Sequence, residues 1–232
     1  MSPVRGARER ARIEVTAAIK DEARRALAAE GAAKLSLRAV ARELGMVSSA
    51  LYRYFPSRDE LLTALIVDAY STLGAAAEAA DARALATAAA PRGRWIAVCQ
   101  AVRKWALEHP HEYALIYGSP VPGYTAPVDT IGPASRVGNT FIGIARAAHA
   151  GRGIALPPLP PELRPEAVRM TGHFAEGLPP EVTAALVAAW AQVFGLISFE
   201  LFGQFTRIVE DRDAFFAHAV GQLAHGVGLP AV

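Results

Sequence analysis

Leu35 to Leu62 read LSLRAVARELGMVSSALYRYFPSRDELL, a pattern of two short helices joined by a tight turn. Ser36 can cap a first helix that runs to Leu44, and Gly45 ends it. A second helix is predicted from about Ser48 to Tyr54. Because the turn is short, the two helices must cross steeply, which leaves one face of the second helix exposed. Helix-turn-helix proteins lay such a face in the major groove of DNA.

Two sets of side chains follow from this arrangement. The inward set packs the two helices together and consists of Leu37, Val40, Leu44, Leu51 and Phe55. The outward set lies on the exposed face and consists of Ser48, Ser49, Tyr52 and Arg53. Serine can donate to phosphates or base edges, arginine can read guanine or neutralise a phosphate, and a tyrosine hydroxyl usually contacts a phosphate.

The remainder of the chain is also helical in pattern. Ser57 to Glu60 form a capping box after Pro56, which predicts the start of a long helix. Alanine is abundant and long alternating apolar runs are missing, so helix is favoured over strand. We predict an all-α fold of about nine helices, at residues 12–30, 37–44, 48–54, 58–80, 94–108, 110–116, 132–150, 181–205 and 211–226.

Composition and charge narrow the function classes. Of the 232 residues, 52% are apolar and 20% are charged, as in globular proteins. Residues 1–60 hold 12 Lys and Arg against 8 Asp and Glu, whereas the remainder holds 12 against 14. A basic end on a near-neutral body suits nucleic-acid contact at that end.

Several kinds of chemistry find no support in the sequence. The basic N-terminus has no apolar segment behind it and no run of about 18 apolar residues occurs, which predicts a cytoplasmic protein without a membrane span. No nucleophile set, acid–base pair or phosphate loop supports an enzyme or a cofactor. The histidines lack ligand spacing for a metal, and Cys99, the single cysteine, is expected to be inert packing.

The motifs resemble a known family. A first helix that ends at Gly31, the segment SLRAVARELG and the segment ALYRYFPSRDELL are similar to the N-terminal domain of the TetR (tetracycline-repressor-like) family of bacterial regulators. The resemblance implies that Tyr52 and Tyr54 lie on the DNA side and that Arg58 flanks the phosphate backbone. Many members carry Ser or Thr after the turn and then Lys, where this chain has Val47 and Ser48.

The resemblance also implies a division of the chain. We expect a flexible basic arm at residues 1–10, a helix-turn-helix domain at 11–56, and a helical ligand-binding and dimerisation domain at 57–232. The predicted DNA contacts are Lys34, Ser36, Arg38, Ser48, Ser49, Tyr52, Arg53, Tyr54 and Arg58. The segment WAQVFGLISFEL further resembles a C-terminal subtype named for Trp, His and Gly; Trp190 and Gly195 match, and Phe194 replaces the histidine.

Two further residue sets are expected in the C-terminal region. The ligand pocket is expected to be lined by Trp95, Cys99, Trp105, Tyr113, Tyr117, Phe141 and His173, although aromatic residues at helical spacing are usually ordinary core. The dimer interface is expected to contain Trp190, Phe194, Ile197, Leu201, Phe216 and Val220.

These expectations define a function. The first hypothesis is a homodimeric regulator, a repressor, that binds a palindromic double-stranded operator and is released by a small, largely apolar effector. One alternative is an all-helical small-molecule-binding protein or carrier whose helix-turn-helix is not used for DNA. Another is a regulator that binds DNA constitutively and has no ligand.

Overall fold

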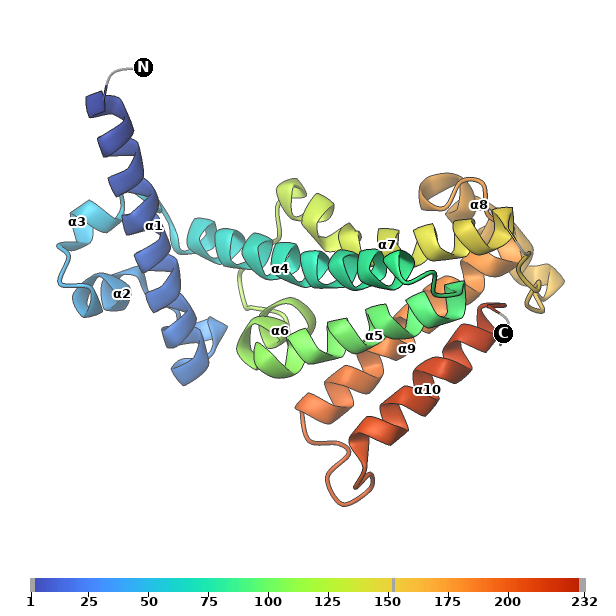
Figure 1. Cartoon of the computed structure of the whole chain (residues 1–232). Helices are drawn as coiled ribbons and strands as arrows, with labels where there is room; N and C mark the ends of the chain where they lie inside the picture. The colour runs from blue at the N-terminus through green and yellow to red at the C-terminus, as the bar shows by residue number, and fades with distance from the viewer. Residues whose placement is uncertain (1–2, 152, 230–232) are drawn as a thin grey trace. The chain divides into compact units, whose positions relative to one another are not determined.

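The structure is a computed structural model that describes residues 3–151 and 153–229. In those residues there are helices and no strands, as predicted. Ten α-helices are present (Figure 1): α1 (Pro3–Glu30), α2 (Leu37–Glu43), α3 (Ser48–Leu51), α4 (Arg58–Ala86), α5 (Pro91–Glu108), α6 (Pro110–Tyr117), α7 (Ile131–Ala150), α8 (Arg164–Phe174), α9 (Pro180–Leu201) and α10 (Arg212–Gly226). Three short 3-10 helices accompany them, η1 (Ala32–Lys34), η2 (Val128–Thr130) and η3 (Pro161–Leu163).

Several helix bounds differ from the predicted ones, and one helix was not predicted. The first helix begins at Pro3, so residues 3–10 are helical rather than a loose arm. Helix α3 ends at Leu51, and residues 52–54 form a turn. Helix α8 was not predicted, because Pro165 in its first turn reads as part of the preceding loop, although proline is well tolerated there.

The chain forms two compact units. The first contains the residues up to Tyr70 together with His109–Ile131, and the second contains Ser71–Glu108 and the residues from Gly132 onward. This division differs from the predicted boundary near Pro56. Half of α4 and the whole of α6 belong to the unit that contains the helix-turn-helix.

The core of the first unit joins α1, α2, α3 and α4. Its buried side chains include Ile19, Leu27, Leu37, Val40, Leu51, Phe55, Leu61 and Leu65. Leu44, expected in the core, is only partly buried at its edge. Leu115, Val121 and Tyr124 pack against the same core, which explains why the segment after α5 belongs to this unit. The segment after α5 therefore supports the helix-turn-helix, although the sequence of the helix-turn-helix does not reveal this contact.

The second unit is built from α5, α7, α8, α9 and α10. Trp95 is fully buried in it, with its ring 4.3 Å from that of Phe141 and its Nε1 donating to the Val220 carbonyl at 3.1 Å. Helices α5, α9 and α10 pack side by side (Figure 1). The segment before η3 is fastened to the end of the chain, since the Ala155 amide donates to the Gly228 carbonyl at 3.0 Å.

Two helices, α4 and α9, are long and apolar enough to cross a membrane by length and composition alone. In their most apolar windows 44% and 39% of the residues are buried inside the protein. Leu61, Leu65 and Leu73 of α4, and Val193 and Ile197 of α9, are core residues. Packing within the two units therefore accounts for these core residues of both helices.

Candidate nucleic-acid interface

The turn between α2 and α3 is fixed by backbone hydrogen bonds. Ser36 caps α2, its hydroxyl oxygen accepting from the Ala39 amide at 3.5 Å. Gly45 has a φ of 65°, in the left-handed region that favours glycine, and the Met46 amide then donates to the Ala41 carbonyl at 2.8 Å. Since these bonds set the direction of the chain into α3, they determine which residues face outward.

Three of the nine predicted contacts are exposed on α3 and in the turn of residues 52–54 that follows it. Ser49, Tyr52 and Arg53 are exposed, whereas Leu51 on the opposite side is fully buried. Ser48 is half-buried. Lys34, Ser36 and Arg38 are also exposed, on η1 and α2. Within the described residues, neither Arg38 nor Arg53 makes an ion pair, so both guanidinium groups are available to an anionic partner.

Tyr54 occupies a different position from Tyr52. Its half-buried side chain packs against the core of the unit and lines a cavity of about 580 Å³ on the side of α1. Ile13, Thr16 and Lys20 of α1 line the same cavity. Tyr54 therefore contributes to the packing between α1 and the segment that follows α3.

Arg58 is engaged by the protein itself. Its guanidinium donates to the backbone carbonyls of Ala32, Ala33 and Leu35, at 2.8, 3.2 and 3.1 Å. These bonds hold the start of α4 against the connection between α1 and α2. Arg58 thus positions the exposed groups of η1 and α2. The sequence predicted a phosphate contact for this residue and did not predict this positioning role.

An ion-pair network that no sequence pattern predicted joins α1, α4 and α6. Arg24 donates to Glu112 at 2.7 Å and to Asp68 at 2.8 Å, and Lys20 donates to Asp68 at 2.9 Å. Burial by itself lowers the pKa of Arg24, but the hydrogen bond to Glu112 and the surrounding carboxylates raise it above its ordinary value overall. The partners are 44 and 88 residues from Arg24, so no local spacing reveals them.

Comparison with known proteins agrees with this geometry. Residues 19–65 match the family model of bacterial regulatory proteins of the tetR family, and residues 95–223 match the tetracyclin repressor-like C-terminal domain. HTH-type transcriptional regulator Rv1816 of Mycobacterium tuberculosis is 44% identical over 207 residues, which cover 86% of each chain. The chain belongs to the TetR family. It is a DNA-binding transcriptional regulator, as the sequence predicted.

Other relatives of this TetR-family chain extend the comparison. HTH-type transcriptional regulator Mb1846 of Mycobacterium bovis matches with the same identity and coverage. The crystal structure of regulatory protein SCO4313 is 34% identical with a TM-score of 0.74, over 94% of this chain and 98% of that one. A protein from Rhodococcus sp. RHA1 shares the fold at 23% identity and a TM-score of 0.69, over 92% and 95% of the two chains. The Trp-His-Gly subtype is not confirmed.

The residues predicted to line a ligand pocket are divided between the two units. Tyr113 and Tyr117 belong to the first unit, with rings 5.2 Å apart, whereas the other five belong to the second. Cys99 is fully buried in the second unit, and burial raises the pKa of its thiol. His173 on α8 is exposed. Neither the cavity beside Tyr54 nor the groove beside Arg103 is lined by any predicted pocket residue.

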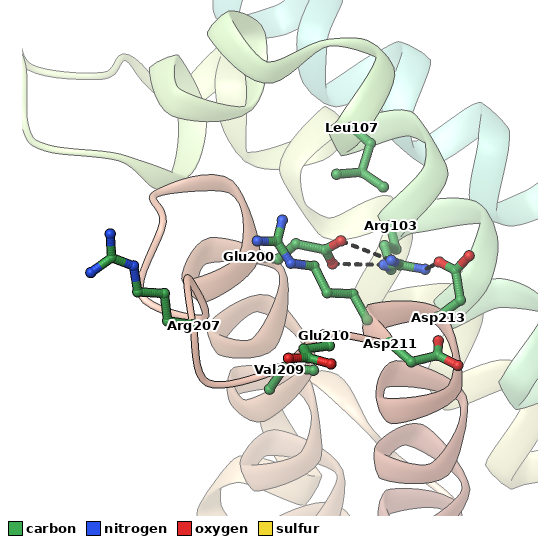
Figure 2. Close-up of a pocket in the computed structure, with 9 residues that line it drawn as sticks. Arg103, Leu107, Glu200, Arg207, Val209, Glu210, Asp211 and Asp213 are labelled. Carbon is green, nitrogen blue, oxygen red and sulfur yellow. Dashed lines mark hydrogen bonds and ion pairs between the residues drawn. The ribbon is translucent and has the colours of Figure 1, made fainter.

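A charged groove of about 780 Å³ lies instead beside α5 and the connection from α9 to α10 (Figure 2). Arg103 donates to both Glu200 oxygens at 2.7 and 2.8 Å and lies 2.7 Å from Asp213. The hydrogen bond to Glu200 is the main cause that raises the pKa of Arg103, although burial acts in the opposite direction. The cluster fastens three helices together, and removal of Arg103 would leave the buried Glu200 carboxylate uncompensated.

Most of the predicted dimer interface is core. Phe194, Ile197, Phe216 and Val220 are at most 6% exposed, so they pack inside this chain. Helix α9 is apolar on several faces, and sequence does not show which face the protein covers itself. Trp190 is 41% exposed and Leu201 half-buried, and Phe199, Phe202 and Phe215 are exposed as well. Among the described residues, no group of three or more His, Cys, Asp or Glu could hold a metal ion.

Proposed function

We propose that this regulator is a repressor that binds a palindromic operator as a homodimer, with α3 of each copy in the major groove. The observation that carries the proposal is the one-sided character of α3. Ser49, Tyr52 and Arg53 are exposed on one face, and Leu51 anchors the other in the core. A helix held this way presents its polar face without losing support when it enters the groove.

Each exposed group has a proposed role in the complex. Ser49 and Arg53 donate to base edges, with half-buried Ser48 beside them, and Tyr52 donates to a phosphate. Lys34, Ser36 and Arg38 contact phosphates on the flank. The Ser36 hydroxyl can do so while it caps α2, because its oxygen accepts from Ala39 and its hydrogen remains free to donate.

The exposed aromatic side chains at the end of α9 and the start of α10 support the dimer. Phe205, in the connection between these helices, has its ring 5.7 Å from Phe199 and 5.5 Å from Phe215. Phe199, Phe202 and Phe215 are 52%, 45% and 40% exposed. A cluster of exposed aromatic side chains of this kind is typical of an interface with another protein. We propose that a second copy covers it.

Release by a small, largely apolar effector completes the proposal. The effector would enter the second unit near Trp95 and Phe141, whose rings lie 4.3 Å apart, and near the buried Cys99 of the same unit. It would stabilise a conformer whose two recognition helices no longer match the spacing of the half-sites. The charged groove at Arg103 suits polar groups rather than such a ligand. The protein is proposed to act in the cytoplasm.

A selection of binding sites tests the proposal. The full-length protein should enrich an inverted repeat from a library of random DNA duplexes, with half-sites about one helical turn apart. Its affinity should fall steeply as salt rises, because phosphate contacts release counterions. Enrichment of no sequence, together with a flat salt dependence, would refute operator binding. A library of small apolar compounds, screened by thermal shift and then by release of the selected operator, tests the effector.

A further inference from the structure

An aliphatic side chain stands at the start of the recognition helix. Val47 is the N-cap residue of α3, and its side chain is 70% exposed. It directly precedes Ser48 and Ser49, on the segment that enters the groove in the proposed complex. In the free protein this side chain is mostly surrounded by water, which is unfavourable for an apolar group.

The fold does not account for valine at this position. N-cap residues are usually Ser, Thr, Asp or Asn, because their side chains accept a hydrogen bond from the first turn. Val47 makes no such bond. The turn before α3 is held by backbone bonds of Gly45 and Met46 instead. The Val47 side chain thus neither caps the helix nor fills the core. Its backbone carbonyl accepts a hydrogen bond from the Ala50 amide at 2.9 Å.

An exposed aliphatic group in a DNA-reading segment has one complementary partner in the major groove. Of the four bases only thymine presents a methyl group there, and apolar side chains read thymine through it. We propose that Val47 is a specificity-determining residue that packs against the 5-methyl group of one thymine in each half-site. The proposal rests on the proposed function, in which α3 occupies the major groove.

Replacement of thymine by uracil isolates this contact, since uracil differs from thymine only by the missing methyl group. Two random duplex libraries, one synthesised with thymine and one with uracil, are selected with the full-length protein. The thymine library should yield a symmetric pair of positions at which thymine is strongly preferred. Uracil at those two positions of the selected operator should weaken binding about fourfold for each half-site, the factor that matches burial of one methyl-sized group.

Three proteins make the comparison specific. Val47→Ala should show a smaller preference for the thymine operator over the uracil operator, because it loses the two γ-methyl groups of valine. Val128→Ala is the matched control, since Val128 is 78% exposed on η2 of the same unit. It should keep the wild-type methyl dependence. Circular dichroism of each variant shows that the fold is retained.

The possible outcomes distinguish a failure of the proposed Val47 contact from a failure of operator binding. Enrichment of an operator that binds equally well with uracil would overturn the role of Val47 while leaving operator binding intact. Val47→Ala that binds more weakly but keeps the methyl dependence would also overturn it, because Val47 would then act only through the stability of α3. Loss of the methyl dependence in Val128→Ala would do the same. No enrichment from either library would refute operator binding, and the inference with it.

Discussion

Arg24 of α1 donates a 2.7 Å hydrogen bond to Glu112 of α6, 88 residues further along the chain. The Glu112 side chain is 16% exposed and that of Arg24 is 31% exposed, so the pair is partly buried and still reached by solvent. The bond fastens α6 to the first helix of the DNA-binding unit.

Glu112→Gln tests the strength of this connection. The amide keeps the shape of the side chain but removes the charge opposite Arg24, so the free energy of unfolding should fall by about 1 kcal/mol. The melting temperature of a chain of this size should fall by about 2–4 °C. The matched control is Glu108→Gln, because Glu108 forms only an exposed pair with Lys104 at 3.8 Å. Equal melting temperatures for the two variants would contradict the prediction.

Arg53 and Arg58 should give opposite phenotypes although they lie five residues apart. Arg53→Ala removes an exposed guanidinium, and should weaken operator binding by about 1–3 kcal/mol with an unchanged melting temperature. Arg58→Ala removes three bonds to backbone carbonyls, and should lower the free energy of unfolding by about 1–3 kcal/mol. Gel-shift titration and thermal unfolding of both variants measure the two effects. Unchanged affinity in Arg53→Ala would remove this residue from the interface.

A charge among the exposed aromatic side chains of α9 and α10 should dissociate the dimer. Phe199→Glu places a carboxylate where the proposed interface excludes water, which is strongly unfavourable. Size-exclusion chromatography with light scattering should then give the mass of one chain, 24.6 kDa, in place of twice that value. Phe174→Glu on α8 is the control, since Phe174 is also exposed but lies on another helix. A monomeric wild-type protein would contradict the proposed dimer.

Alkaline pH should destabilise the protein through Tyr70 and Tyr117. Burial raises the pKa of both side chains above the ordinary value of 10.0, and at Tyr117 the neighbouring tyrosines add to the effect. The unfolded chain therefore loses these protons at a lower pH than the folded chain. Their contribution to stability is complete below about pH 10 and is lost as the pH rises further. Urea unfolding between pH 8 and 12 should show a shallower decline for Tyr117→Phe than for the wild type.

Cys99 should be unreactive in the folded protein. Its side chain is fully buried in the second unit, and burial raises the pKa of the thiol, so little thiolate is present near neutral pH. A thiol reagent such as Ellman's reagent should modify no cysteine in native buffer and one cysteine in guanidinium chloride. Rapid modification of the native protein would instead indicate a reactive, accessible thiol.

The sequence by itself determined the local features of this protein. Ser36 and Gly45, with the apolar spacing of Leu37, Val40 and Leu51, specify two helices and a turn, because caps, turns and helical faces depend on neighbours within a few residues. The same short-range signals placed Ser49 and Arg53 on the exposed face of α3. They were also sufficient for the all-α fold and for the family resemblance that the comparisons confirmed.

Only the tertiary structure decided the features that join distant residues. It showed that Glu112 binds Arg24, that Arg58 is engaged by carbonyls of the preceding connection, and that Phe194 and Ile197 of α9 are covered by their own chain. The identity of an apolar or charged residue does not show which distant segment will cover it or pair with it. That choice depends on how all the helices pack at once. The DNA-binding motif can therefore be predicted from the sequence. The contacts that support it, and the exposed surface of α9 and α10, cannot.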